Sequence, residues 1–410
     1  MSQKPTHAPL IQFPVIDDEL VVGGLGLRQL AAQLGQTPFY AYDRECMSRR
    51  VRELREDLPE GISIHYAMKA NPMPAVVDHM AGLVDGLDVA SLGELRVALD
   101  SGTPAAEISF AGPGKGDTEL RGAVAAGITL NLESEGELER VIRIAEETGV
   151  TPRVAVRVNP DFELKSSGMK MSGGPKPFGI DAEQVPAVLR RIGESGAQFR
   201  GLHIFSGSQN LRPDSLIEAQ NATFELALRL ADDAPSAIEI LNIGGGFGIP
   251  YFPGEQRLDL APVSENLQQL LQAYRGRLGD TEVVIELGRY LVAEAGVYVC
   301  EVIDKKVSRG QVYLVTNGGL HHHLAASGNF GQIIRKNYPV VTAHRVSGVP
   351  RENVSVVGPL CTPLDILADK MDLGTAEVGD LMVVLQSGAY GYTASPHLFL
   401  GHPPPIQVLV

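Results

Sequence analysis

The chain has little of several features that mark particular classes of protein. Its three cysteines, Cys46, Cys300 and Cys361, are odd in number and widely spaced. Neither a disulfide framework nor a zinc-site spacing follows from them. Basic residues are also in the minority, because 35 Lys and Arg stand against 49 Asp and Glu and give a net charge of −14. This acidic balance argues against general nucleic-acid binding, which requires basic patches.

Long apolar runs are absent as well. No run reaches membrane-spanning length, and residues 1–5 lack the apolar core of a signal peptide. We therefore expect no membrane association and a location in the reducing cytoplasm. What remains is ordinary for a globular protein: 410 residues, 44% of them hydrophobic and 20% charged. A chain of this length can bury a large core and is expected to hold two domains.

From about residue 45 to residue 295, short β-branched runs alternate with helical patterns. The expected strands are Ile62–Ala67, Gly86–Ser91, Glu107–Gly112, Thr129–Ser134, Arg153–Val158, Gly201–Gly207, Glu239–Gly244 and Glu282–Gly288. The expected helices between them are Gly93–Leu99, Thr118–Ala126, Glu135–Glu147, Ala182–Ile192, Leu216–Leu230 and Val263–Leu278. Eight strands alternating with helices predict a (β/α)8 TIM barrel, an α/β fold.

After Gly296 the pattern becomes β-rich, with segments separated by glycine and proline. The expected strands are Val297–Lys306, Gln311–Thr316, Val354–Val357, Leu381–Leu385 and Ile406–Val410. Near the N-terminus, Leu20–Val22 is strand-like and one helix is expected near Leu27–Leu34. We predict three segments. Residues 1–42 join the β domain, residues 43–295 form the barrel, and residues 296–410 form a β domain that completes the active site.

Lys69 is the most informative residue of the chain. It follows the alternating apolar strand in the run Ile64–Pro72. A lysine just past a strand is usually a solvated surface residue. At the mouth of a barrel, flanked by Met68 and Ala70, it is well placed to be desolvated. Desolvation lowers the pKa of an amine and frees it to form a Schiff base.

Other candidate residues fall at the C-terminal ends of the predicted strands, the face on which barrel enzymes build active sites. Asp88 lies in the second strand, Ser208 follows the sixth, Gly244–Gly246 follow the seventh, and Glu286 ends the eighth. The glycine run can bind phosphate through bare backbone N–H groups, with a tight turn as the alternative. It is not the dinucleotide fingerprint, which would need glycine in place of Ile249.

Three further segments each have a functional and a structural interpretation. Glu286 and Arg289 lie three residues apart, which alone would suggest an ion pair. Cys361 in the run Gly358–Thr362 is either a functional thiol or a buried inert one. Tyr390 in Gly388–Tyr392 either presents its hydroxyl to a phosphate or forms a core turn. The run His321–His323 suggests a metal, but consecutive residues on a strand point to opposite faces, so we predict no metal site.

Together and in this order, the motifs resemble those of the ornithine/diaminopimelate decarboxylase family of alanine-racemase-like barrel enzymes. The resemblance covers nearly the whole chain. It is carried by Ile64–Pro72, Leu87–Ser91, Arg157–Pro160, Phe178–Ile180, Gly244–Gly246, Glu286–Tyr290, Gly358–Cys361 and Gly388–Gly391. It implies the cofactor pyridoxal 5′-phosphate, decarboxylation of a small-molecule amino acid, and a homodimer with shared active sites.

The resemblance also assigns roles to individual residues. Lys69 looks like the lysine that holds the cofactor covalently. Glu286 looks like the partner of the pyridine nitrogen, which keeps the ring able to accept electrons as CO2 leaves. Cys361 resembles the thiol that reprotonates the substrate carbon across a dimer interface. The implied phosphate ligands are Ser208, Gly245, Gly246, Arg289 and Tyr390, and Asp88, His203 and Phe205 are further implied cofactor contacts.

The chain departs from the family pattern at the distal half of the substrate site. Thr362 follows the cysteine where diaminopimelate decarboxylases usually carry glutamate, and the aspartate that ornithine-type enzymes have near Asn317 is missing. Asn317, His323 and Thr362 become the candidate substrate-binding residues. A family histidine that stacks on the cofactor is replaced by Phe205, so Phe205 is expected to stack, with His203 on the same strand face.

Residues Thr316–Asn329 resemble a narrower subgroup, the decarboxylases associated with exosortase A systems and the glutamyl-carrier-protein decarboxylase of butirosin biosynthesis. We predict a substrate conjugated at its distal end, such as a thioester of an acyl carrier protein, because a free buried ammonium would need a carboxylate partner. For Arg335 and Lys336 we favour a solvated basic pair, with contact to the phosphate or acidic surface of a carrier as the alternative.

Three other functions stay open at this point. The first is decarboxylation of free diaminopimelate or another free diamino acid. The second is racemisation on the same fold, which Glu286 disfavours because a racemase typically places an arginine at the pyridine nitrogen. The third is a non-catalytic cofactor-binding barrel, against which residues 296–410 argue.

Overall fold

A computed structural model describes residues 5–162, 169–170 and 173–410. The chain divides into two compact units. The barrel unit contains Val51–Gly248 and Leu258–Gly288, and the β-rich unit contains the chain up to Arg50, Ile249–Arg257 and Arg289–Val410. Within the described residues, no helix is both long and apolar enough to cross a membrane.

In the described part of the barrel unit, eight parallel strands close into a ring, because β8 pairs with β9 and completes the circle. The ring confirms the (β/α)8 barrel expected from the sequence. Its order is β9 (Arg153–Asn159), β12 (Gln198–His203), β14 (Ile240–Gly245), β15 (Glu282–Leu287), β5 (Ile62–Ala67), β6 (Gly86–Val89), β7 (Ile108–Phe110) and β8 (Thr129–Leu132).

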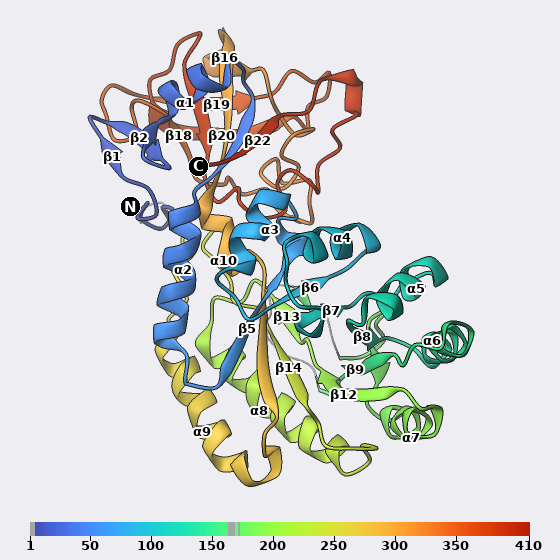
Figure 1. Ribbon diagram of the computed structural model, residues 1–410. Coiled ribbons are helices and arrows are strands. Elements are labelled where there is room, and N and C mark those ends of the chain that lie inside the picture. The colour runs from blue at the N-terminus through green and yellow to red at the C-terminus, as the bar shows by residue number, and fades with distance from the viewer. Residues whose placement is uncertain (1–4, 163–168, 171–172) are drawn as a thin grey trace. The chain divides into compact units, whose positions relative to one another are not determined.

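Helices cover the outside of the ring, and α4 to α7 lie along its outer face in Figure 1. The helices of this unit are α3 (Pro74–Ala81), α4 (Leu92–Asp100), α5 (Asp117–Ala126), α6 (Glu135–Thr148), α7 (Val185–Ser195), α8 (Pro213–Ala231) and α9 (Ala261–Leu278), and α2 (Arg44–Asp57) begins in the β-rich unit. Short strands add to the ring's loops: β11 (Ile180–Asp181) pairs with β9, and β10 (Met169–Lys170) pairs with β13 (Gly207–Ser208).

Local sequence signals explain where these helices begin and end. The side chain of Ser91 accepts a hydrogen bond from the backbone N–H of Glu94 and caps α4, and Ser134 caps α6 in the same way. Gly127 ends α5 with φ +70° and Gly149 ends α6 with φ +69°, left-handed conformations that favour glycine. Each cap therefore starts or stops a helix next to a barrel strand, so that the strand ends, and the side chains they carry, are fixed.

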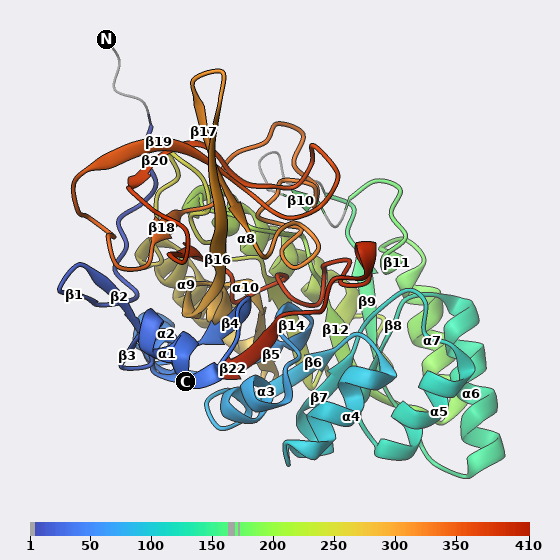
Figure 2. The ribbon, with the colours of Figure 1, turned by 90° about the horizontal axis from the view of Figure 1, so that it is seen from above.

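The β-rich unit is built on one sheet with strands from distant parts of the chain, including the long β16–β17 hairpin visible in Figure 2. The path is β18 (Val340–Thr342), β21 (Leu381–Val384), β16 (Gly296–Ser308), β17 (Gln311–Thr316), β19 (Arg351–Val357) and β20 (Ile366–Gly374). β4 (Phe39–Tyr42) pairs with β16 and with β22 (Ile406–Leu409).

Smaller elements of the N-terminal region complete this unit. A three-stranded sheet contains β1 (Val15–Ile16), β2 (Glu19–Val22) and β3 (Leu25–Gly26). The helix α1 (Leu27–Leu34) follows β3 in the chain, and the short helix α10 (Arg289–Val292) follows β15. The apolar core joins the early and late parts of the chain, since Leu20, Leu27 and Phe39 pack with Val299 and Val383. Residues 1–42 and 296–410 thus contribute to one core.

The barrel segment predicted as residues 43–295 differs from the compact units at its edges. Residues 43–50, 249–257 and 289–295 belong to the β-rich unit. The physical reason is an ion cluster, in which the buried carboxylate of Glu294 pairs with Arg50 and, at 2.7 Å, with Arg257. These three residues come from the three stretches, and the cluster ties them together.

Candidate active site

Lys69 lies in a short helical turn, Met68–Ala70, directly after β5. Its side chain is 46% exposed, and its Nζ atom lies 3.6 Å from Oε1 of Glu286. The neighbours Met68 and Ala70 are buried. The desolvation expected for Lys69 from the sequence is therefore wrong for the amine itself. The flanking residues anchor the turn in the core, while the amine remains accessible beside an opposite charge.

Glu286 is almost fully buried near the end of β15, which pairs with β5 in register Glu286 to His65. Its Oε2 atom lies 3.1 Å from Nε2 of His203, the last residue of β12. Burial raises the pKa of Glu286, but the charge of Lys69 and the close approach of His203 outweigh it and hold that pKa well below its usual range. The carboxylate is thus ionised at neutral pH.

Phe205 is the aromatic side chain beside Lys69, with Nζ 5.7 Å from the centre of its ring. β12 ends at His203, so Phe205 lies beyond the strand and the two residues do not share a strand face as the sequence suggested. Gly244, with φ +68°, leaves room for the ring, because a Cβ atom there would lie 2.9 Å from it. Stacking of Phe205 on the cofactor stays a prediction.

Asp88 belongs to a buried polar network inside the barrel. Its Oδ1 atom accepts a hydrogen bond of 2.6 Å from Ser109 and lies 3.2 Å from Nδ1 of His65. Asn131 donates to Ser109 at 3.0 Å and extends the network. The partners of Asp88 are thus protein side chains, and the cofactor contact that the resemblance implied for it stays a prediction.

Neighbouring backbone atoms lie so close to the glycine run at the end of β14 that they leave no room for side chains. A Cβ atom at Gly245 would lie 2.5 Å from the carbonyl oxygen of Glu286, and one at Gly246 would lie 2.2 Å from that of Gly207. Gly246 also has φ +72°. Ser208 lies in β13, which pairs with β10. The glycines are thus explained by close packing at the strand ends, and phosphate binding by Ser208, Gly245 and Gly246 stays a prediction.

In the β-rich unit, Arg289 lies among tyrosines. Its guanidinium donates to the hydroxyl of Tyr251 at 3.0 Å and lies 4.7 Å from the ring centre of Tyr390. Tyr390 has φ +54°, a strained conformation for a residue with a side chain. The structure thus brings together two of the implied phosphate ligands, Arg289 and Tyr390, and adds Tyr251, which sequence reasoning did not single out.

Cys361 is an exposed free thiol, so the alternative of a buried inert cysteine is wrong. Its loop is held by Asp365, a buried residue that sequence reasoning missed. The Asp365 carboxylate accepts hydrogen bonds from the backbone N–H of Leu320 at 2.6 Å and of Leu360 at 2.9 Å. Burial raises the pKa of Asp365, and these hydrogen bonds oppose that rise. Asp365 therefore ties the cysteine loop to the loop after β17.

The predicted substrate-binding side chains already have partners within the β-rich unit. Asn317 donates to Thr37 and accepts from the backbone of Glu301. Both ring nitrogens of His323 are engaged, by Ser387 at 2.9 Å and by the N–H of Ala326 at 3.2 Å. The hydroxyl of Thr362 accepts from Leu364 at 3.3 Å. Substrate binding by these residues stays a prediction, and for His323 it would require an existing contact to break.

The histidine run occupies a turn after β17, and the strand geometry assumed for it from the sequence is wrong. All three side chains are buried. His322 contacts the hydroxyl of Tyr298 and the carbonyl of Pro403. Burial lowers the pKa of His321 and of His323 to about 3 and that of His322 to about 4. All three imidazoles are therefore neutral at pH 7.

The two residues of the basic pair, Arg335 and Lys336, differ in their surroundings. The guanidinium of Arg335 donates to the carbonyls of Ser327 and Ile366 and is engaged by its own unit. Lys336 lies next to Ile333 and Ile334, two fully or largely exposed apolar side chains. Arg335 thus has a structural role, so the favoured interpretation of a solvated basic pair is wrong for Arg335, and contact of Lys336 with a carrier stays a prediction.

Comparisons with known proteins place the chain in a family. Residues 44–293 match the family model described as pyridoxal-dependent decarboxylase, pyridoxal binding domain. The chain is 40% identical to an L-glutamyl-[BtrI acyl-carrier protein] decarboxylase of Niallia circulans, over 91% of this chain and 89% of that protein. It is 31% identical to a 2-[(L-alanin-3-ylcarbamoyl)methyl]-2-hydroxybutanedioate decarboxylase of Staphylococcus aureus, over 92% and 95%.

Its fold is similar to that of diaminopimelate decarboxylase from M. jannaschii in a co-complex with L-lysine, with a TM-score of 0.86 and 26% identity over 97% of this chain and 92% of that one. These matches confirm the resemblance to this family that the motifs indicated. The chain belongs to the pyridoxal-dependent decarboxylases and is an amino-acid carboxy-lyase.

Proposed function

We propose that this protein uses pyridoxal 5′-phosphate to decarboxylate an amino acid whose distal end is conjugated, with an L-glutamyl thioester of an acyl carrier protein as the leading substrate. The observation that carries the chemistry is the group formed by Lys69, Glu286 and His203 at the C-terminal ends of the barrel strands. The observation that carries the substrate is that the candidate distal-site residues Thr362 and Asn317 have no charge.

The residues of the barrel unit fit the cofactor. A pyridine ring that bears a carbonyl group needs an accessible amine and a carboxylate that is buried and still ionised. Lys69 and Glu286 supply both within 3.6 Å of each other. In the β-rich unit, the guanidinium of Arg289 contacts only neutral tyrosine groups among its observed partners Tyr251 and Tyr390, which suits an anionic phosphate.

Bound pyridoxal phosphate supplies a ring that accepts the electron pair left behind when CO2 departs. The chain's own groups have separable tasks. Nζ of Lys69 holds the cofactor, and the carboxylate of Glu286 holds a proton at the pyridine nitrogen. Nε2 of His203, 3.1 Å from Oε2, orients that carboxylate and keeps it ionised. Sγ of Cys361 delivers a proton to the substrate carbon after CO2 has left.

The substrate proposal rests on charge. A free distal ammonium or carboxylate would bring a charge to the site, and an unpaired buried charge costs several kcal/mol. Thr362 and Asn317 are neutral, and so are the three buried histidines at pH 7. A thioester or amide requires only hydrogen-bond partners. Two relatives point the same way, because one is named for a carrier-linked glutamyl group and the other for a carbamoyl-linked amino acid.

The test compares kcat/KM for CO2 release from an L-glutamyl carrier-protein thioester with the values for free glutamate, diaminopimelate, ornithine and lysine. We expect the conjugate to be preferred at least about a hundredfold, the discrimination produced by one unpaired charge costing about 3 kcal/mol. An equal or better kcat/KM for a free diamino acid would overturn the substrate proposal and leave the decarboxylase assignment intact.

We also propose a homodimer in which the exposed Cys361 of one protomer serves the lysine of its partner, in a reducing cytoplasmic setting. The resemblance to the family supports the shared site. The three cysteines are free thiols, as expected for that setting. Sedimentation of the holoenzyme measures the oligomeric state, and the complementation experiment in the Discussion tests the sharing.

A further inference from the structure

A second cluster of metal-ligating side chains lies on or directly beside the barrel strands β5, β7 and β15. His65 lies within β5, Glu282 is the first residue of β15, and Glu107 directly precedes β7. One ligand atom from each residue can be chosen so that all three lie within 4.8 Å of one another. These residues take no part in the chemistry proposed above, and sequence reasoning did not connect them.

The histidine of this cluster is buried and held in one orientation. It is 5% exposed, and its Nδ1 atom lies 3.2 Å from Oδ1 of Asp88. Among the residues that the structure describes, Nε2 of His65 has no hydrogen-bond partner. A histidine whose one nitrogen faces a carboxylate while the other points to a metal is the usual arrangement in metal sites, because the carboxylate fixes the tautomer and the ring orientation.

The backbone makes room for this ring. A Cβ atom at Gly86 would lie 2.5 Å from Nε2 of His65 and 2.5 Å from the carbonyl oxygen of Glu107. Glycine at the start of β6 thus lets the imidazole lie across the strand toward Glu107. Any larger residue would displace the ring from the two glutamates.

Neither glutamate is held by a close ion pair within the described residues, although Glu107 interacts electrostatically with Arg153. Both side chains are partly buried, and neither forms an ion pair with lysine or arginine in the described parts of the chain. Burial lowers the pKa of His65, but Asp88, Glu282 and Glu286 outweigh it and raise that pKa above its usual value. The alternative to a bound metal is therefore a protonated His65, whose positive charge would partly offset the negative charges of Glu107 and Glu282.

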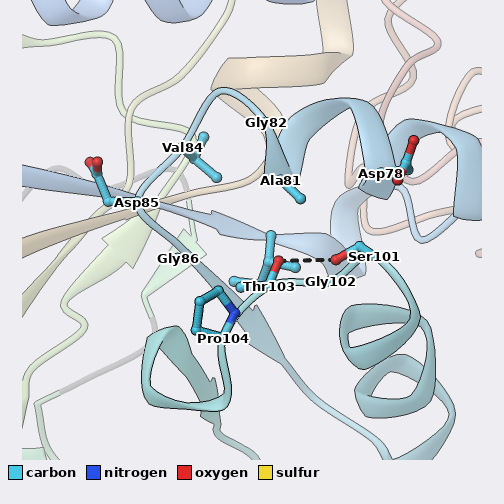
Figure 3. A pocket seen from close by; sticks show the side chains of 11 residues that line it. Asp78, Ala81, Gly82, Val84, Asp85, Gly86, Ser101, Gly102, Thr103 and Pro104 are labelled. Atoms are coloured by element: carbon cyan, nitrogen blue, oxygen red, sulfur yellow. Dashed lines mark hydrogen bonds between the residues drawn. The ribbon is translucent and has the colours of Figure 1, made fainter.

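A pocket on the surface of the barrel unit lies beside this cluster. It has a volume of about 290 Å³ and is lined by Gly86, Thr103 and Pro104 among other residues (Figure 3). The hydroxyls of Ser101 and Thr103, 3.0 Å apart, lie at its side. Gly86 thus borders both the pocket and the His65 ring.

We propose that His65, Glu107 and Glu282 bind one divalent transition-metal ion, with Asp88 orienting the histidine. One imidazole and two carboxylates suit Zn2+ or Mn2+. Bonds of about 2.1 Å in tetrahedral geometry place ligand atoms about 3.4 Å apart, which small side-chain rotations achieve from the present spacing. The ion would link β5, β15 and the residue before β7, and would stabilise the barrel by holding these segments together.

The experiment measures bound metal in the holoenzyme. The protein is stripped with chelator, incubated with Zn2+ or Mn2+, passed through a desalting column, and analysed by mass spectrometry for metal and by absorption for retained cofactor. We expect one equivalent per chain and a higher melting temperature with metal. Glu107→Gln/Glu282→Gln should lose the bound ion while keeping the cofactor, and Asp88→Asn should weaken binding about 10- to 100-fold.

Glu183→Gln is the matched control, because Glu183 is an exposed glutamate of the same unit outside the cluster. It should bind metal like the wild type. Wild-type protein that holds neither ion after desalting would overturn the proposal and leave the imidazolium in place. Retention of one equivalent by the double variant would also overturn it and would point to the thiols or the histidine turn. The wild-type measurement is decisive even if a variant fails to fold.

Discussion

Replacing Glu286 by glutamine should nearly abolish turnover while leaving most of the cofactor bound. The side chain is 6% exposed, lies 3.6 Å from Lys69 and 3.1 Å from His203, and is held ionised by them. An amide keeps the shape but cannot hold a proton at the pyridine nitrogen. Breaking a buried ion pair costs about 3–5 kcal/mol, which corresponds to about 10²- to 10⁴-fold in kcat when the pair acts in the transition state.

The assay measures CO2 release under saturating substrate, with the cofactor content read from its absorption. Glu137→Gln is the matched control, because Glu137 is a buried carboxylate of the same unit paired with Lys115 at 2.9 Å. It should lower stability and leave kcat of the folded holoenzyme near wild type. A Glu286→Gln enzyme with wild-type kcat, or an equal kcat loss in both variants, would refute the role given to Glu286.

Three further predictions follow from the same residues. Borohydride treatment of the holoenzyme should fix the cofactor on Lys69, as peptide mapping will show, and labelling of another lysine would contradict the assignment. Cys361→Ala should lower kcat about 10²- to 10⁴-fold, and mixing it with Lys69→Ala should restore part of the activity; no restoration despite proven subunit exchange would exclude shared sites. His321, whose pKa burial lowers to about 3, binds its proton in the unfolded chain below about pH 6.5 but not in the native one. Stability should therefore fall as the pH drops from 7 to 5, by up to about 2 kcal/mol from this residue, and His321→Phe should reduce that fall in thermal unfolding; an unchanged pH dependence would contradict the burial argument.

The approach of Lys69 to Glu286 was predictable because its signals are local. The predicted strand Ile62–Ala67 coincides with β5, and Lys69 follows it. Strand ends in a parallel barrel meet on one face, so the register alone suggested that Lys69 and Glu286 approach each other. The same logic failed for the desolvation of Lys69, because the exposure of a side chain depends on loops that local sequence does not specify.

What the sequence could not provide depends on contacts between distant segments. β4 was missed, although it is fully buried, because its partners β16 and β22 lie more than 250 residues away. The structural role of Asp365 is visible only from the hydrogen bonds that its carboxylate accepts from the backbone N–H groups of Leu320 and Leu360. The partners of His323 likewise become visible only when Ser387 is placed beside it.

The proposed cofactor-binding residues and the proposed distal-site residues belong to different units of the chain. Lys69, Glu286 and His203 belong to the barrel unit, whereas Asn317, Cys361, Thr362 and the histidine turn belong to the β-rich unit. Within that unit, the carboxylate of Asp365 accepts hydrogen bonds from Leu360 in the cysteine loop and from Leu320 beside the histidine turn, and so holds the two segments together. Substitutions at the turn can therefore alter which distal group is accepted without changing the ionised carboxylate beside Lys69. We infer that such a separation lets relatives share one decarboxylation chemistry while their names specify diaminopimelate or carrier-linked glutamate.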